Sequence, residues 1–229
     1  MFSFKPYPGL KSSALLSSKC RRIFLPVCLL LSFFLLLGSS ELNAQPVTGD
    51  YQTFQSGQWS NPATWSRWDG ATWVNPAPAP SNLDGAITVL NGHVVNVQSA
   101  LSFDQVVVNS GGQLLVFAAL NILDGSGTDL TTNGQVLFGV GSSINIGANA
   151  FIDGSQSIAC DAATLLNAGT INNQLVMQGQ AFGPQTISGV GIIGSLLISN
   201  TQGVTLGSDH VVRDLLNFNN GNISTGPSS

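Results

Sequence analysis

Four tryptophans close together in the sequence are the side chains that most directly suggest a binding role. Trp59, Trp65, Trp68 and Trp73 span only 15 residues and are all the tryptophans in the chain. A flat aromatic face can stack on a sugar ring, and a large indole can also bury much apolar area in a cap over the end of a stacked fold. We expect Trp59 and Trp65 to be buried in such a cap. Trp68 and Trp73, which flank Asp69-Gly70, are the candidate carbohydrate-binding residues.

The histidines and the cysteine beyond residue 44 do not form a metal-binding or nucleophilic pattern. His93 follows a turn, His210 lies beside Asp209, and neither has a second His or Cys at ligand spacing. We expect His93 to be structural, near a corner of the fold, and His210 to pair with Asp209 in a loop. Cys160 is expected to be a small buried hydrophobic residue. The sequence therefore predicts no metal site and no cofactor.

One acidic segment has the spacing of a calcium-binding loop. Asp124-Gly125-Ser126-Gly127-Thr128-Asp129 places oxygen-bearing side chains at alternating positions. The segment lacks the closing Glu and the additional acids that such loops use to hold the ion. We therefore predict a polar turn here.

The residues needed for catalysis on polysaccharides are sparse. Such enzymes use paired carboxylates, or a carboxylate with Arg, Lys or His, in one groove. Beyond residue 44 the chain has no Lys, two arginines far apart (Arg67 and Arg213), and aspartates mostly at turn-like positions. No phosphate-binding Gly loop followed by Lys and no Ser nucleophile elbow is present. We predict that the protein is not an enzyme; the alternative is the N-terminal part of a polysaccharide-active enzyme.

The N-terminus has the three parts of a secretory signal peptide. Its first 22 residues carry five cationic residues and no acid, and an apolar run of 15 residues, 23–37, follows. This run is shorter than the roughly 20 residues that span a bilayer. Small residues end it, and Ala44 is the predicted cleavage position. We predict a signal peptide over 1–44 and an extracellular or outer cell-surface location; an uncleaved signal anchor is the alternative. Membrane contact is expected only through the signal peptide before cleavage.

Removing residues 1–44 makes the chain strongly anionic. Two arginines against ten aspartates and no glutamate give a formal charge of −8. Nucleic acid as a partner is excluded, because binding phosphates requires clustered Lys and Arg. Cys160 alone survives cleavage, so no intrachain disulfide can form, and about 185 residues are enough to bury a core without one.

The remaining chain has the texture of an all-β protein. Short runs rich in Val, Ile and Leu alternate with Gly, Asn, Ser and Asp, as in 86–90, the turn Asn91-Gly92, and 93–97. No run has the length and 3.6-residue period of a helix. The segment 160–167 is the one ambiguous stretch, which could form a short helical turn. The prolines of 75–80 predict a stiff, extended linker.

Degenerate repeats predict how the strands stack. Gly112 to Phe117 matches Gly134 to Phe138 at an offset of 22, and Gly169-Thr170-Ile171 matches Gly191-Ile192-Ile193 at the same offset. A third match, Gly203 to Leu206 with Gly221 to Ser224, has an offset of 18. Units of this size cannot bury their own apolar faces, so they stack. We predict a right-handed parallel β-helix, or solenoid, preceded by a signal-peptide helix; a β-sandwich is the alternative.

The predicted organisation has three parts. Residues 1–44 form the signal peptide, 45–82 a Trp-rich N-terminal cap with the Pro-rich linker, and 83–229 the solenoid repeats. The repeats stop abruptly, with no polar cap or sorting domain visible, so we expect a fragment of a longer protein.

A motif near the N-terminus carries a resemblance to a known group of proteins. Gly57-Gln58-Trp59-Ser60-Asn61-Pro62-Ala63-Thr64-Trp65, followed by Asp84 and Asn91-Gly92-His93-Val94-Val95-Asn96-Val97, resembles the G8-like entry segment of secreted Bacteroidetes-type β-solenoid proteins. Here Asp84-Gly85 inverts the usual Gly-Asp order, and an extra segment, 68–73, intervenes. Residues 186–229 resemble the repeat arrays of such cell-surface proteins. The resemblance implies a structural or adhesin-like role, with extracellular glycans or surface proteins as partners.

Overall fold

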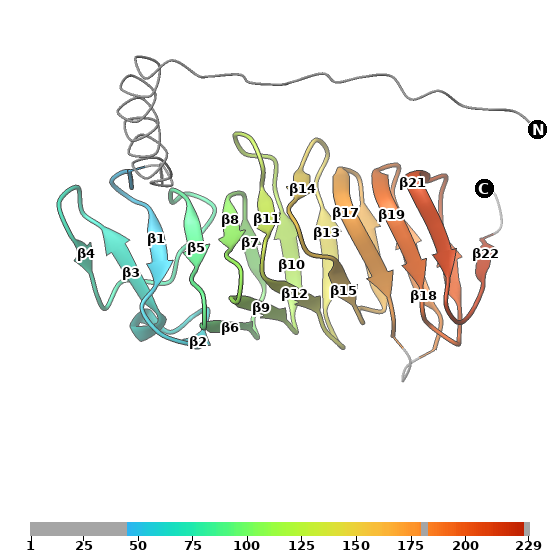
Figure 1. Ribbon diagram of the computed structural model, residues 1–229, viewed down its shortest axis with the longest axis horizontal. Coiled ribbons are helices and arrows are strands. Elements are labelled where there is room, and N and C mark those ends of the chain that lie inside the picture. The colour runs from blue at the N-terminus through green and yellow to red at the C-terminus, as the bar shows by residue number, and fades with distance from the viewer. Residues whose placement is uncertain (1–44, 180–182, 227–229) are drawn as a thin grey trace, which may run out of the picture. The chain divides into compact units, whose positions relative to one another are not determined.

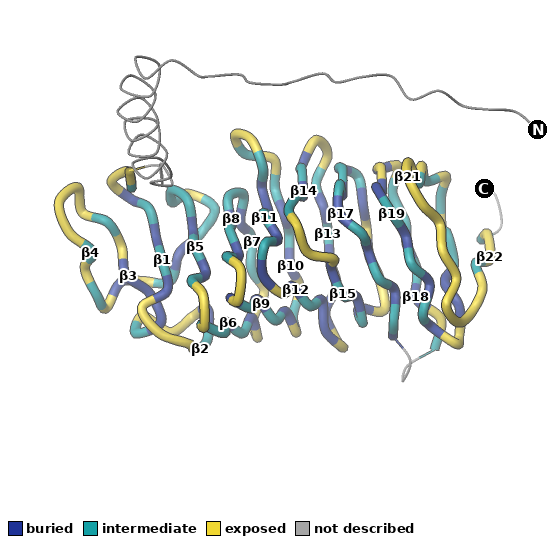
Figure 2. The backbone as a smooth tube through the Cα atoms, in the orientation of Figure 1, coloured by how far each residue is buried: buried dark blue, intermediate teal, exposed yellow. Residues whose placement is uncertain are grey.

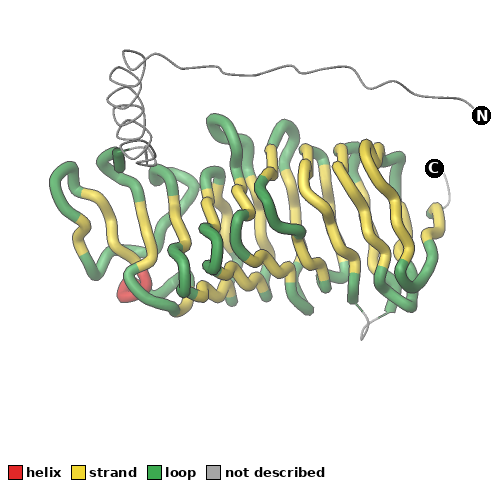
Figure 3. The backbone as a smooth tube through the Cα atoms, in the orientation of Figure 1, coloured by secondary structure: helices red, strands yellow, loops and turns green. Residues whose placement is uncertain are grey.

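The computed structural model describes residues 45–179 and 183–226, which form a stack of parallel β-strands in about six turns (Figure 1). Fifteen strands form one sheet, here the large sheet, and seven form a second, the small sheet. The helical content of the described chain is small, with one 3-10 turn at Pro62–Thr64 (Figure 3). The predicted parallel β-solenoid is thus confirmed, and the β-sandwich alternative is not what forms. The predicted signal peptide and its cleavage at Ala44 lie outside the described residues.

Most turns of the stack contribute two strands to the large sheet and one to the small sheet. The strands of the large sheet are β1 (Tyr51–Thr53), β2 (Gly57–Gln58), β3 (Trp65–Trp68), β4 (Trp73–Val74), β5 (Ile87–Val89), β6 (Val94–Val97), β8 (Val106–Val108), β9 (Gln113–Val116), β11 (Leu130–Thr132), β12 (Gln135–Phe138), β14 (Phe151–Asp153), β15 (Ile158–Cys160), β17 (Thr170–Met177), β19 (Ile192–Ile198) and β21 (Val211–Phe218). The small sheet contains β7 (Leu101–Phe103), β10 (Ala119–Ile122), β13 (Ser143–Ile146), β16 (Thr164–Asn167), β18 (Gln185–Ser188), β20 (Val204–Leu206) and β22 (Ile223–Thr225).

Alternating apolar residues build one continuous core along the stack (Figure 2). In a strand, successive side chains point to opposite faces, so every second residue faces inward. The burial of β17, alternating over all eight residues, follows this rule. Inward residues of adjacent turns lie next to each other, as in the row Leu175, Leu196 and Leu216. This row of leucines, one per turn, shows how the core is built.

The repeat offsets agree with the strand register in two of three places. Gln113 pairs with Gln135 and Ile171 with Ile193, both at the predicted offset of 22. The third prediction, an offset of 18, is wrong by one residue, because Val204 pairs with Ile223. Pairing at 18 would place Asn222 opposite the buried Val204. A one-residue slip turns every inward side chain outward, so the apolar residues set the register here rather than the glycines.

The helical turn considered for 160–167 does not form. Cys160 ends β15 and Thr164–Asn167 is β16, with inward-facing Leu165 fully buried. The two strands that each early turn gives to the large sheet also merge later: β17 continues both β14 and β15. The register shifts between Ile171 and Gln174, so a bulge replaces the earlier corner.

Stacked amides are present, but mainly on the outer face of the small sheet. The Asn145 side chain donates to Asn121 Oδ1 at 3.1 Å, and Asn121 donates to Ser102 Oγ at 3.2 Å. Asn173 is buried instead at the former corner, where its Nδ2 lies 2.8 to 2.9 Å from Thr132 Oγ1 and from two carbonyl oxygens. These contacts link successive turns through side chains in addition to the backbone ladder.

The N-terminal cap is continuous with the stack. β1 pairs in parallel with β5, and β3 and β4 extend the same sheet in antiparallel fashion. The proline-rich segment is packed against this cap: Ala77 is buried and its N–H lies 3.2 Å from Trp65 O. The segment predicted as a linker is therefore held in place as part of the cap.

The far end of the described stack presents apolar side chains. Val212, Leu216 and Phe218 of β21 continue the inward rows of β19. Leu216 is 44% exposed and Phe218 49% exposed, whereas Leu196 and Ile198 below them are buried. Within the described residues, β21 pairs only with β19, so its other edge is open.

Candidate functional site

Trp59 and Trp65 close the first turn of the stack, as expected. Their rings meet edge to face with centroids 4.9 Å apart, and Trp59 stacks on Phe103 at 6.0 Å. Both indole N–H groups are satisfied: Trp59 donates to Pro80 O at 2.9 Å and Trp65 to Trp59 O at 2.7 Å. A buried indole with its donor paired is fully used by packing. These two residues are therefore core residues of the cap.

Trp68 and Trp73 lie opposite each other on the antiparallel pair β3 and β4. Both are half-buried, and their rings meet edge to face with centroids 5.4 Å apart. The turn between them is fixed by Asp69 Oδ1, which accepts the backbone N–H groups of Ala71 and Thr72 at 2.8 Å each. These hydrogen bonds hold the Asp69 pKa below its ordinary value. The pair is thus a preformed aromatic surface on a tight hairpin.

A small hollow lies on the other side of this hairpin. It has a volume of about 220 Å³ and is lined by Arg67, Asp69 and Val74 together with the proline-rich segment. Because side chains alternate along a strand, Arg67 and Val74 point away from the face that carries Trp68 and Trp73. The two tryptophans therefore do not line the hollow. Arg67 instead has its guanidinium carbon 5.9 Å from the centre of the Tyr51 ring.

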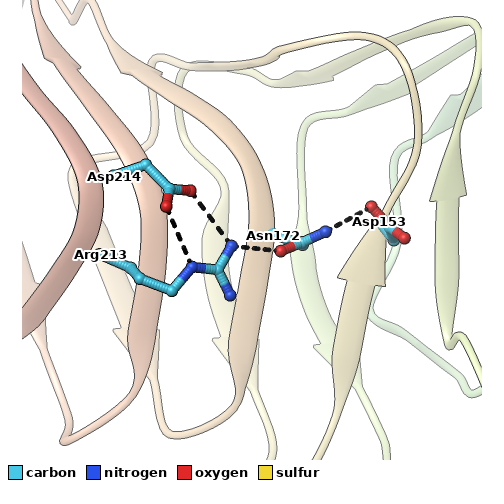
Figure 4. Close-up of polar contacts among 4 residues, drawn as sticks. All are labelled: Asp153, Asn172, Arg213 and Asp214. Atoms are coloured by element: carbon cyan, nitrogen blue, oxygen red, sulfur yellow. Dashed lines mark hydrogen bonds and ion pairs between the residues drawn. The ribbon is translucent and has the colours of Figure 1, made fainter.

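The stack brings together four polar residues that are distant in sequence (Figure 4). Asn172 donates to Asp153 Oδ1 at 2.9 Å, and Arg213 donates to Asn172 Oδ1. Arg213 also forms an ion pair with Asp214, at 3.2 Å, and this contact raises the pKa of the guanidinium. Two carboxylates, an amide and a guanidinium thus lie in one row across β14, β17 and β21.

A glycine makes this row possible. Gly194, in β19, separates Asn172 from Arg213, and a Cβ on it would lie 2.3 Å from Asn172 O. Without a side chain there, Arg213 can reach over β19 to Asn172. The sequence analysis missed this cluster because it judged the arginines and aspartates by sequence distance. The signal that would have found it is the turn-to-turn register, which places Asp153, Asn172, Gly194 and Arg213 at equivalent positions.

This polar row fits a structural role better than a chemical one. Arg213 and Asp214 are about half-exposed, where an ion pair contributes only about 0 to 1 kcal/mol. The guanidinium is occupied by partners from the protein itself. The row adds side-chain links between turns near the end of the described stack, where the backbone has fewer neighbours.

Each histidine contacts oxygen atoms of the protein. His93 Nδ1 lies 2.7 Å from Thr53 Oγ1, which ties the start of β6 to β1 of the cap. His210 lies between two carbonyl oxygens, with Nδ1 2.9 Å from Ser208 O and Nε2 3.2 Å from Ser188 O. The expected partner of His210, Asp209, is replaced by these carbonyls from the adjacent turn. Both residues thus tie neighbouring turns together.

Cys160 and the Asp124 to Asp129 loop are explained by packing and turn geometry. Burial raises the pKa of the Cys160 thiol to about 12, as for a buried hydrophobic residue. Asp129 is buried, and its two carboxylate oxygens accept the N–H groups of Gly125 at 2.7 Å and Phe151 at 2.6 Å. These bonds close the loop and tie it to the next turn, as a polar turn would.

Two searches of the described residues gave no site. Among residues 45–179 and 183–226, no group of three or more His, Cys, Asp or Glu side chains is arranged to hold a metal ion. In the same part of the chain, no helix is long and apolar enough to cross a membrane.

Comparison with known proteins gives no relative for this chain. No protein-family model matches it, and neither a curated protein nor a solved structure does. The resemblance to G8-like and repeat segments of secreted β-solenoid proteins therefore stays a prediction from the motifs. What is established is the architecture: the chain folds as a parallel β-solenoid closed at its N-terminal end by a tryptophan cap.

Proposed function

We propose that the mature chain is a secreted or cell-surface structural protein, a non-catalytic β-solenoid with an adhesin-like role. The observation that supports this best is the uninterrupted parallel register of the small sheet, which runs from β7 to β22. Backbone hydrogen bonds between successive turns and a continuous apolar core make such a stack stiff. A stiff stack suits a spacer or platform that presents a surface outside the cell.

The outer face of the small sheet also supports a role as a platform. One outward row consists of small neutral side chains, one from each successive turn: Ala119, Ser143, Thr164, Thr186, Thr205 and Ser224. Parallel strands are spaced by about 4.8 Å, so these side chains form a regular, uncharged array. Such a face can contact repetitive partners over its whole length.

The location and the absence of catalysis can be tested separately. Cells that make the chain with its own leader should yield a mature protein that starts at Gln45 and is cut by external protease in intact cells. Protection of the chain until the cells are lysed would contradict surface display. The purified 45–229 chain should release no reducing ends from neutral or acidic polysaccharides, and their release would refute the non-catalytic proposal.

A second candidate function is carbohydrate binding by Trp68 and Trp73. The favouring observation is that both rings are partly exposed on a hairpin held by Asp69. The test is a glycan array with the wild-type chain and with Trp68→Ala and Trp73→Ala. Binding that is lost in both variants supports this function, and absence of binding by the wild type removes it.

A further inference from the structure

A polar groove crosses the large sheet where the two strands of each turn meet. Its volume is about 480 Å³, and it spans three successive turns at the starts of β9, β12 and β15. Gln113, Asn133, Gln135, Gln156 and Ser157 line it. Gln113 and Gln135 are register neighbours on adjacent parallel strands, about 4.8 Å apart. The groove therefore follows the direction in which the turns stack.

The floor of the groove is backbone that cannot carry side chains. A Cβ on Gly134 would lie 2.3 Å from Asn109 O and 2.3 Å from Gly112 O. The contact with rigid backbone atoms excludes any larger residue without movement of the turn below. The hollow is thus a consequence of how closely the turns approach at this corner.

The side chains that line the groove are available for a ligand. Gln135, Gln156 and Ser157 are exposed, and Gln113 is partly exposed. Their side chains have no hydrogen bond to another of the described residues, in contrast to Gln105, which donates to Ser126. Each amide offers both a donor and an acceptor. Among the described residues that line the groove, none carries a charge.

These properties select one class of ligand. Charged polymers require clustered opposite charge, which the groove does not offer. An extended peptide binds by adding a strand to a sheet edge, whereas β9 and β12 are paired on both sides. A neutral polysaccharide presents hydroxyl groups that both donate and accept hydrogen bonds along a linear chain. We propose that the groove binds a neutral polysaccharide chain lying across successive turns, independently of Trp68 and Trp73.

The test is binding of the purified 45–229 chain to cellulose, xylan, mannan and curdlan, with polygalacturonate as the charged probe. The variant Gln113→Ala/Gln135→Ala removes two neutral amides, so affinity for the bound neutral polysaccharide should fall about 30-fold. The matched control is Gln202→Ala, an exposed glutamine outside the groove, which should bind as the wild type does. Circular dichroism and urea midpoints equal to those of the wild type would show that the double variant is folded.

The outcomes separate this site from the tryptophan pair. Wild-type binding that survives Trp68→Ala/Trp73→Ala and is lost in the glutamine variant supports the groove. Three results would overturn the proposal: no neutral polysaccharide bound, binding of polygalacturonate alone, or a folded glutamine variant with unchanged affinity.

Discussion

The stacked core predicts that one substitution has a different cost at different turns. Leu175 and Leu216 belong to the same inward row, joined through Leu196. Leu175 is fully buried in the middle of the stack, whereas Leu216 is 44% exposed on β21. Replacing each with Ala therefore makes the same chemical change in the same row, with and without a covering turn.

The expected magnitudes follow from burial. Leu175→Ala leaves a cavity between two strands, and such changes cost about 2 to 5 kcal/mol, so we expect about 3 kcal/mol. Leu216→Ala leaves no enclosed cavity and loses about half of the apolar burial, so we expect about 1 kcal/mol. With a urea dependence of about 2 kcal/mol per molar, the unfolding midpoints should fall by about 1.5 M and about 0.5 M.

The assay is urea unfolding followed by two signals. Far-UV circular dichroism reports the whole stack, and tryptophan fluorescence reports the cap, because all four tryptophans lie between residues 59 and 73. Coincident curves from both signals would justify treating the transition as two-state. Equal midpoint shifts for Leu175→Ala and Leu216→Ala would refute the reasoning, because they would mean that β21 is as well covered as β17.

Further predictions concern buried polar and titratable groups. Cys160 should react with a thiol reagent at least about 100-fold more slowly in the native chain than in urea, because burial raises its pKa to about 12. The free energy of unfolding should also fall as the pH rises from about 9 to about 12, since the unfolded thiol ionises first, and Cys160→Ala should remove this part of the fall. Burial, and then the nearby charge of Asp129, raise the pKa of Asp104, so stability should rise as the pH falls from neutral toward that pKa; Asp104→Asn should flatten the rise in urea midpoints. Asn173→Ala should lower the free energy of unfolding by about 2 to 3 kcal/mol, because it leaves buried oxygens without a donor, while the surface change Asn121→Ala should cost less than about 1 kcal/mol; similar costs would count against the corner assignment.

The fold could be predicted from local patterns because a solenoid repeats them. Period-2 alternation marks the inward residues, and the offset of 22 gives the register wherever a turn has constant length. The register failed between Val204 and Ile223, where a turn has a different length and glycines suggested a false alignment. Burial of Trp59 and Trp65 could also be expected, because the first turn of a stack needs a cover.

The candidate sites were harder to predict, because they depend on which residues of successive turns become neighbours. The row from Asp153 to Arg213 requires the register and the gap at Gly194, neither of which composition reveals. The polar groove likewise forms only because Gln113 and Gln135 are brought together beside a glycine floor. In both cases the residue types were visible in the sequence, but their distances were not.

The parallel stack itself can be tested most directly by distance measurements between spin labels on the small sheet. In a Cys160→Ala background, Ala119→Cys is combined in turn with cysteines at Thr164, Thr186, Thr205 and Ser224, which occupy one outward row. The stack predicts distances that grow by about 4.8 Å per strand, reaching about 24 Å for Ser224, five strands away. Distances that do not increase in this order would contradict the solenoid.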